Sequence, residues 1–263
     1  MNFMKFDIKY FMVAYLGGLL GLSSWYFGNL ETFFTGLFIA ILYSVLDVLW
    51  TYMRDKIWYF PVSSLISGFV LALVAYPDSP IGMIFLLPFF AVISKQVIWI
   101  GRGRHIFNPA AFSVAMVGIF GLGMSSWWGV SWGVVPLMIT ALCGLFITWY
   151  LVKWKILFSF LVSYIVFSAL FFYGSAASEH VMDLAVSLAD GTLIFFATVM
   201  LIEPMTSMFN DGKERIIYGV LVGFFAILAA YFIEGTFSLR ADPLILGLLG
   251  GNLVASLLFI DKK

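Results

Sequence analysis

The basic residues of this chain fall into six short clusters, and apolar stretches separate each cluster from the next. Of the 14 Lys and Arg residues, only Arg240 lies outside these clusters. Lys and Arg in short loops are retained on the cytoplasmic side of a membrane, so this spacing predicts a multi-pass topology with all six clusters inside. The clusters are Lys5/Lys9, Arg54/Lys56, Lys95/Arg102/Arg104, Lys153/Lys155, Lys213/Arg215 and Lys262/Lys263.

The composition points to the same class of protein. Of the 263 residues, 63% are hydrophobic and only 11% are charged, whereas soluble domains have about 25% charged residues. We therefore expect an integral membrane protein whose main partner is the lipid bilayer. The formal net charge is zero and there is no basic stripe, which argues against a nucleic-acid partner. The first apolar run, 11–27, lacks a small-residue cleavage site and is interpreted as the first span.

The apolar runs predict an all-α integral membrane protein that forms a single membrane domain, 1–263, with about ten transmembrane segments. Both termini are then cytoplasmic. An odd number of segments in each half, about 10–122 and about 130–260, makes the second half enter from the opposite side, as in an inverted repeat. The predicted segments are 10–28, 33–53, 60–76, 81–96, 106–122, 130–152, 156–174, 186–203, 215–233 and 243–260.

Each half has a proline-marked break near its fourth segment. Asn108-Pro109 begins the fifth segment, where Asn caps a helix and Pro suits its first turn, and Glu203-Pro204 ends the eighth. Irregular backbone at membrane depth is tolerated only where protein or a polar cavity satisfies its polar groups. We therefore expect the two breaks to face one another and to enclose a polar pocket.

The loop before Asn108 is the strongest local signal for a binding site. Lys95, Arg102, Arg104 and His105 lie there beside two glycines. Such cations next to a Gly-rich turn and a helix N-terminus suit an anionic group such as a phosphate. The alternative interpretation is a basic loop that only sets the topology.

The element Asp190-Gly191-Thr192 is predicted to begin the eighth segment on the outer side. An aspartate there needs no function, because Asp is a good helix cap and suits the positive end of the helix dipole. Thr192 nevertheless offers a hydroxyl, which we expect at the membrane surface.

Two acids lie within or beside apolar segments, where ionisable groups are expensive and indicate function by default. Glu203 is expected at the inner face, and the alternative is an interfacial ion pair with Lys213 or Arg215. Asp47 is the deepest acid, and we expect it either to reach toward Arg54 or to line a polar path for an ion.

The chain is poor in ligands for inorganic redox centres. Cys143 is the only cysteine, which excludes disulfides and Cys-ligated iron–sulfur clusters within the chain. His105 and His180 are predicted on opposite sides of the membrane, which argues against a bis-His haem. A redox cofactor in this chain would therefore be organic.

Several short elements occur in an order that resembles one membrane family. From about residue 60 to its end, the chain is similar to the RnfD/NqrB family, whose members are membrane proteins of the Rnf electron-transport complex and of the sodium-translocating NADH:quinone reductase. The elements are Ser63-Ser64-Leu65, Gly68, Leu71-Ala72-Leu73, Pro77/Pro80, Lys95-Gln96, GRGRHIFNPAAF (101–112), DGT (190–192), EPMTS (203–207, with Thr206) and Ile217-Tyr218-Gly219.

The resemblance implies ten spans in two inverted five-helix halves, similar to urea channels, in the cytoplasmic membrane of a prokaryote. It implies FMN esterified through its phosphate to a threonine of a Ser-Gly-Ala-Thr element, and riboflavin in some members. An ungapped alignment places that threonine on Leu193, and a shift of one residue makes Thr192 the acceptor. The alternatives are a flavin that is bound without a covalent link and an outer site that holds no flavin. The candidate cofactor-binding residues are Thr192, Asp190, Gly191, Lys95, Arg102, Arg104, His105, Asn108, Glu203 and Thr206.

Two functions remain open from the sequence. One is a flavin-binding membrane subunit, not autonomous as an enzyme, that relays electrons between a soluble flavoprotein or iron–sulfur partner and a flavin, quinone or other membrane acceptor. Ion movement is a further expectation for such a complex. The other is a channel or transporter for a small solute or cation on the same fold, with Asp47 and Glu203 along its path.

Overall fold

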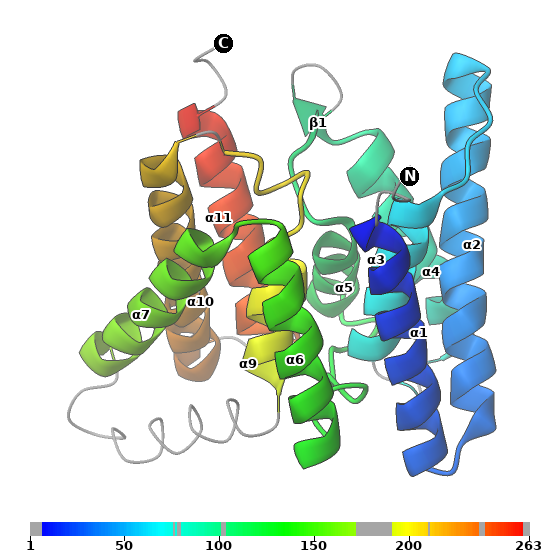
Figure 1. Ribbon diagram of the computed structural model, residues 1–263, viewed down its shortest axis with the longest axis horizontal. Helices are drawn as coiled ribbons and strands as arrows, with labels where there is room; N and C mark the ends of the chain where they lie inside the picture. Colours follow the sequence, from blue (N-terminus) through cyan, green and yellow to red (C-terminus); the bar gives the residue numbers. More distant parts are fainter. Residues whose placement is uncertain are drawn as a thin grey trace, which may run out of the picture.

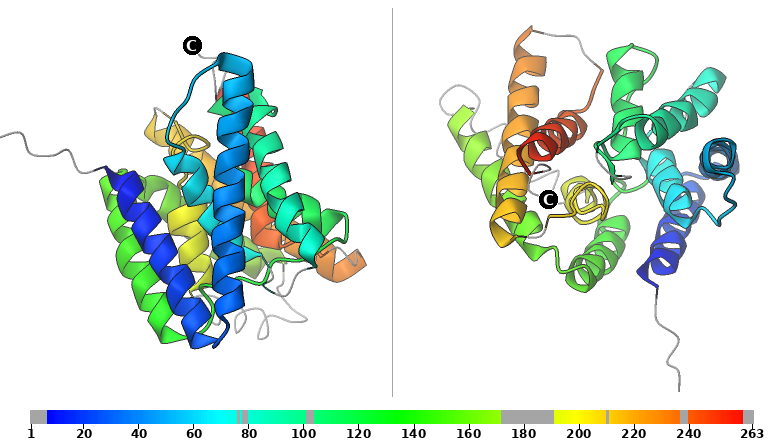
Figure 2. Two further views of the ribbon diagram at one scale, coloured as in Figure 1. Left: turned by 90° about the vertical axis from the view of Figure 1, so that its right-hand side faces the viewer. Right: turned by 90° about the horizontal axis from the view of Figure 1, so that it is seen from above.

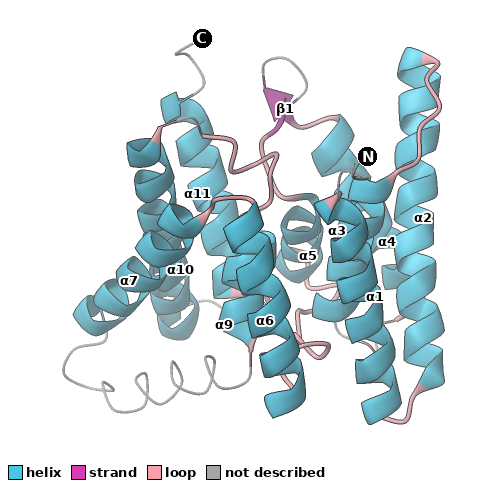
Figure 3. Ribbon diagram, in the orientation of Figure 1, coloured by secondary structure: helices cyan, strands magenta, loops and turns pink. Residues whose placement is uncertain are grey.

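The computed structural model describes residues 7–75, 77, 80–100, 104–171, 191–209, 211–236 and 240–259, with only the backbone described at 234–236. Two candidate residues from the sequence, Arg102 and Asp190, lie outside these ranges, as does His180. The described chain is almost wholly α-helical (Figures 1 and 3). The fold is therefore all-α.

The helices follow the predicted segments closely. The predicted span 81–96 coincides with α4, whereas the breaks shorten the helices beside them, as in α5 and the segment after Gly191. The first half contains α1 (Ile8–Tyr26), α2 (Leu30–Asp55), α3 (Val62–Val74), α4 (Ile81–Gln96), the antiparallel strands β1 (Trp99–Ile100) and β2 (Arg104–His105), and α5 (Pro109–Ile119). The second half contains α6 (Val134–Tyr150), α7 (Trp154–Phe171), α9 (Thr192–Phe195) with the π-helix η1 (Phe196–Met200), α10 (Gly212–Thr236) and α11 (Pro243–Phe259).

Among the residues that the structure describes, three helices are long and apolar enough to cross a membrane, namely α2, α7 and the part of α10 at Gly212–Ile233. Helix α2 has its polarity reversed relative to a helix of a soluble protein. It buries Ser44 and Asp47 against the other helices and exposes Phe34, Phe38 and Leu49 on its outer face. An apolar surface over a polar interior is the pattern that a lipid environment favours.

The two halves lie side by side, with the short helices in the interior (Figures 1 and 2). Within the first half α2 packs on α3 and α4, and within the second half α10 packs on α7 and α11. The halves meet where α5 contacts α11 and where α1 contacts α6. Residues of α3, α5, α9 and η1 supply much of the buried core, so these short elements are enclosed by the longer helices.

The end of α3 depends on the segment that follows α5. A helix leaves its last carbonyl groups without partners, and inside the bundle water does not supply them. The backbone N–H of Gly129 donates to the Leu73 oxygen at 3.1 Å, and the indole of Trp128 donates to the Ala72 oxygen at 2.8 Å. The link between the halves therefore completes a helix of the first half.

Helices α5 and α11 begin in the same way at opposite ends of the bundle. Asn108 precedes Pro109, and its side chain accepts from the Ala111 N–H at 3.0 Å. Asp242 precedes Pro243, and its side chain accepts from the Leu244 N–H at 2.8 Å. Asn108 also donates to the Met200 oxygen in the second half, and Asp242 accepts from the indole of Trp127, in the link between the halves, at 2.6 Å.

The packing of α3 on α2 requires a glycine, which gives a test of this interface. A Cβ on Gly68 would lie 2.5 Å from the Cα of Ala40, whereas a Cβ on Gly82 in α4 would meet nothing within 4 Å. Gly68→Ala is therefore expected to lower the stability by about 1–3 kcal/mol, as overpacking does. Gly82→Ala, the matched control, is expected to be neutral or to stabilise by about 0.5–1 kcal/mol. Thermal unfolding in detergent measures both, and equal losses would contradict this packing.

Candidate functional site: a cavity between two helix breaks

A cavity of about 530 Å³ lies between the two halves where the helix breaks meet. We call it the central cavity. Its wall combines groups from α1, α3, α4, α5 and the segment around η1. The polar lining includes Lys95, Gln96, His105, Asn108, Glu203, Ser63 and Ser67, and the apolar lining includes Met12, Ile66, Val70, Pro109, Val199 and Met200.

Asp47 is the centre of a polar network beside this cavity, although its own side chain is fully buried. Its Oδ2 accepts from Lys95 Nζ at 2.9 Å, from the hydroxyl of Ser64 at 2.5 Å and from the hydroxyl of Tyr59. Its Oδ1 accepts from the amide of Gln96 at 2.6 Å. We call these five residues the Asp47 centre. Burial of this carboxylate is compensated by an ammonium and three neutral donors.

The sequence-based expectation that Asp47 reaches toward Arg54 is wrong. Arg54 instead pairs with its neighbour Asp55 at 2.8 Å, at the exposed end of α2. Asp47 lies two turns earlier, and its partner Lys95 comes from the end of α4, 48 residues away in sequence. Burial of the phenol raises the pKa of Tyr59 to about 12, and contact with the Asp47 carboxylate adds to this shift.

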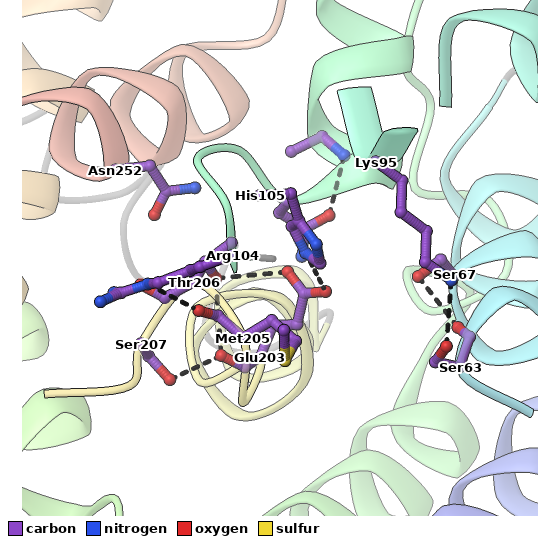
Figure 4. A network of polar contacts seen from close by, with 12 residues as sticks. Ser63, Ser67, Lys95, Arg104, His105, Glu203, Met205, Thr206, Ser207 and Asn252 are labelled. Atoms are coloured by element: carbon purple, nitrogen blue, oxygen red, sulfur yellow. Dashed lines mark hydrogen bonds and ion pairs between the residues drawn. The ribbon is translucent and has the colours of Figure 1, made fainter. Parts of the chain in front are cut away.

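Glu203 lies on the opposite wall and pairs with His105. The Nε2 of His105 is 3.2 Å from Oε1 of Glu203, and the hydroxyl of Thr206 donates to Oε2 at 3.2 Å (Figure 4). The alternative prediction, an ion pair of Glu203 with Lys213 or Arg215, is therefore wrong. Arg215 donates to the backbone oxygens of Phe209 and Val152 instead.

Arg104 and Asn108 satisfy the carbonyl groups that the second break leaves free. Arg104 donates to the oxygens of Met205 and Thr206, each at 3.0 Å, and more weakly to that of Met208 at 3.4 Å. Asn108 donates to the Met200 oxygen at 3.2 Å. The loop before α5 therefore holds the loop after η1, and burial lowers the pKa of the Arg104 guanidinium.

Thr192 lies apart from this group of residues. It begins α9, its side chain is 8% exposed, and it does not line the central cavity. Gly191 has a positive φ of 87° and packs against the backbone of Val130 and Leu137, which places this helix start against the segment that leads into α6. The protein therefore covers most of Thr192, and its expected position at the membrane surface stays a prediction. Of the candidate residues, Lys95, His105, Asn108 and Glu203 line the cavity. Arg104 and Thr206 lie beside it, where Arg104 binds the loop after η1 and Thr206 binds Glu203.

Three residues with roles in this region were not identified from the sequence. Tyr59 and Ser64 both bind Asp47, and the signal for them was a tyrosine and two serines at the start of a short apolar helix. Lys153 is buried and donates to the Ser207 oxygen at 2.6 Å. Burial, with the nearby charges of Arg215 and Arg104, lowers the pKa of Lys153 to about 8.

The donor set does not favour a transition-metal centre. Within the described ranges, His, Cys, Asp and Glu side chains form no group of three or more that would hold a metal ion. The two carboxylates beside the cavity are each paired with a cationic or imidazole side chain from the same chain. The site therefore consists of paired carboxylates around a mixed polar and apolar space.

No protein-family model matches this chain, and no curated protein sequence matches it either.

The pKa of Lys153 predicts a pH dependence of stability. Its folded-state pKa, about 8, is below its usual value of 10.5, so the unfolded chain holds the proton more tightly. Stability is therefore expected to rise as the pH increases from about 8 to 10.5 and to lose this contribution as the pH falls through 8. Unfolding midpoints across this range measure it. Lys153→Met should remove the rise, and the exposed neighbour Lys155→Met should retain it; a rise that persists in Lys153→Met would contradict the assignment.

Proposed function

We propose that this protein is a flavin-binding, electron-transferring subunit of a membrane complex and that the central cavity is its flavin site. The observation that carries the proposal is the cavity itself. Its volume, about 530 Å³, lies in the range of about 300–1,000 Å³ that is typical of small-molecule sites. Its lining combines apolar side chains with a few polar groups, which suits a flat aromatic ring that has polar edges.

The residues present fit such a group. Val70, Val199 and Met200 offer apolar surface for the faces of an isoalloxazine ring. Lys9 and Arg54 also line the cavity and suit the phosphate of FMN, whereas riboflavin needs neither. A bound flavin supplies reversible electron transfer that no side chain of this chain provides. The ion pair Lys95–Asp47 and the contact between His105 and the Glu203 carboxylate would set the electrostatic potential around it.

The flavin in this proposal is held without a covalent bond. Thr192, the candidate acceptor of an FMN phosphate ester, is buried at the start of α9 and is absent from the cavity wall. A covalent adduct on Thr192 would therefore belong to a second place in the fold. The proposal assigns the cavity to FMN or riboflavin and assigns no cofactor to Thr192.

We further propose that the fold is an inverted repeat of two five-helix halves, similar to that of urea channels. The two Asx-Pro helix starts support this, because Asn108-Pro109 and Asp242-Pro243 cap α5 and α11, the last helix of each half, in the same way. Such a pair is expected where the second half repeats the first from the opposite side. This match differs from the pairing of Asn108-Pro109 with Glu203-Pro204 that the sequence indicated.

The proposal places the chain in the cytoplasmic membrane of a prokaryote, with both termini inside. Arg54, Lys95, Arg104, Lys153 and Arg215 belong to one end of the bundle, which is the arrangement expected for the cytoplasmic side. A soluble flavoprotein or iron–sulfur protein would exchange electrons at that end. A quinone or another flavin is the proposed membrane acceptor.

One observation favours a second candidate, a channel or transporter. Each half contributes a carboxylate beside the central cavity, Asp47 from the first and Glu203 from the second. Ionisable groups facing an internal space are typical of paths for ions and solutes. A solute path needs no chromophore, so colour separates the two candidates.

The flavin proposal predicts a yellow protein whose colour depends on the cavity wall. Purified protein supplied with FMN or riboflavin should absorb in the flavin bands, and denaturation should release the flavin. Ser67→Trp fills the cavity and should abolish the absorbance, whereas Val162→Trp, on the exposed face of α7, should retain it. Thr192→Ala should also retain it. A folded protein that binds neither flavin would contradict the proposal and leave the transport candidate.

A further inference from the structure

We propose that the Asp47 centre is a site for a monovalent cation and that the chain supplies the cation itself, as the ammonium group of Lys95. The inference concerns the polar network beside the cavity and does not depend on a bound flavin. The ammonium group of Lys95 and a free Na⁺ are then alternative occupants of one site that is lined by oxygen atoms.

The geometry around Lys95 carries the proposal. Its Nζ donates to three oxygen atoms, namely Oδ2 of Asp47 at 2.9 Å, the hydroxyl of Ser64 at 2.7 Å and the hydroxyl of Ser63 at 3.1 Å. An ammonium group has three N–H donors and no acceptor, so these three oxygens match its full hydrogen-bonding capacity. All three acceptors are oxygen atoms, which are also the ligands that hard cations prefer.

The oxygen atoms that bind the Lys95 ammonium are held in place by residues other than Lys95. Gln96 fixes Oδ1 of Asp47 and also donates to the hydroxyl of Thr51 at 3.1 Å, while Tyr59 donates to Oδ2. The serines come from the first turn of α3, whose N-cap residue Pro61 provides no side-chain cap. Removing the lysine side chain leaves these anchors in position.

The charge balance selects a monovalent occupant. Asp47 is fully buried and is the one carboxylate of the centre, so it requires a single positive charge nearby. A divalent ion would leave an uncompensated charge inside the bundle. A sodium ion would restore the neutrality that the Lys95 ammonium provides.

The central cavity gives a free ion access to the same place. Lys95 and Ser63 both line the cavity, and the Lys95 side chain is 16% exposed while that of Asp47 is 0% exposed. Figure 4 shows Lys95 and Ser63 across the open region from His105 and Glu203. An ion that enters the cavity therefore reaches the position of the ammonium without crossing the packed core.

The test compares the thermal stability of variants that lack the Lys95 side chain in NaCl and in choline chloride at equal ionic strength. Lys95→Ala, purified in detergent, should show a saturable rise of the unfolding midpoint in NaCl, roughly 5–10 °C at a hundredfold excess over the dissociation constant. Wild-type protein should show no difference between the two salts, because its site is already filled. Lys56→Ala, which removes an exposed lysine at the end of α2, should behave as the wild type does.

Two further variants make the result decisive. The double variant Lys95→Ala/Asp47→Asn should lose the NaCl response, because the carboxylate that binds the ion is gone. Lys95→Ser replaces the alanine variant if that variant does not fold. The proposal is overturned if folded Lys95→Ala responds equally to both salts, or if the wild type gains the same NaCl stabilisation. It is also overturned if neither Lys95→Ala nor Lys95→Ser folds in either salt.

Discussion

The need to satisfy backbone polar groups where helices end inside the bundle shapes this protein. The second break leaves carbonyl groups between Met200 and Met208, and side chains from the first half bind them. Arg104 donates hydrogen bonds to three of these oxygens, and Asn108 donates to one. At the other end, Trp128 and Gly129 satisfy the end of α3. Each unsatisfied group would cost several kcal/mol in an apolar surrounding, so the halves are held together where the helices are broken.

Two side-chain pairs follow from the same constraint. The breaks leave a space that longer helices would have filled, and the carboxylates of Asp47 and Glu203 lie on two sides of it. Each is paired with a group from a distant element, Lys95 at the end of α4 and His105 in β2. A pair of this kind is costly to break, because removing one partner leaves an unpaired buried charge. The polar character of the central cavity is therefore built into the fold and leaves its apolar faces available to a ring-shaped ligand.

Much of the architecture was predictable from the sequence, because apolar runs and basic clusters are local signals. The bounds of α4 agree fully with the predicted segment, and the break at Asn108 is a helix cap as expected. The partners of Asp47 and Glu203 were not predictable. Sequence proximity favours Arg54 and Arg215, whereas the actual partners depend on how α4 and β2 pack against other helices. The similarity between Asn108-Pro109 and Asp242-Pro243 was a usable signal that sequence reasoning missed.

The contact between the two breaks is the feature that a cross-linking measurement tests most directly. Cysteines at positions 105 and 203, in a Cys143→Ser background, should be joined by a short bifunctional thiol reagent in intact membranes, and mass spectrometry of the joined peptides measures the yield. We predict efficient linkage of this pair and none between cysteines at 105 and 192. No linkage between 105 and 203, or linkage of 105 to 192 instead, would contradict the enclosure of the central cavity by the two halves.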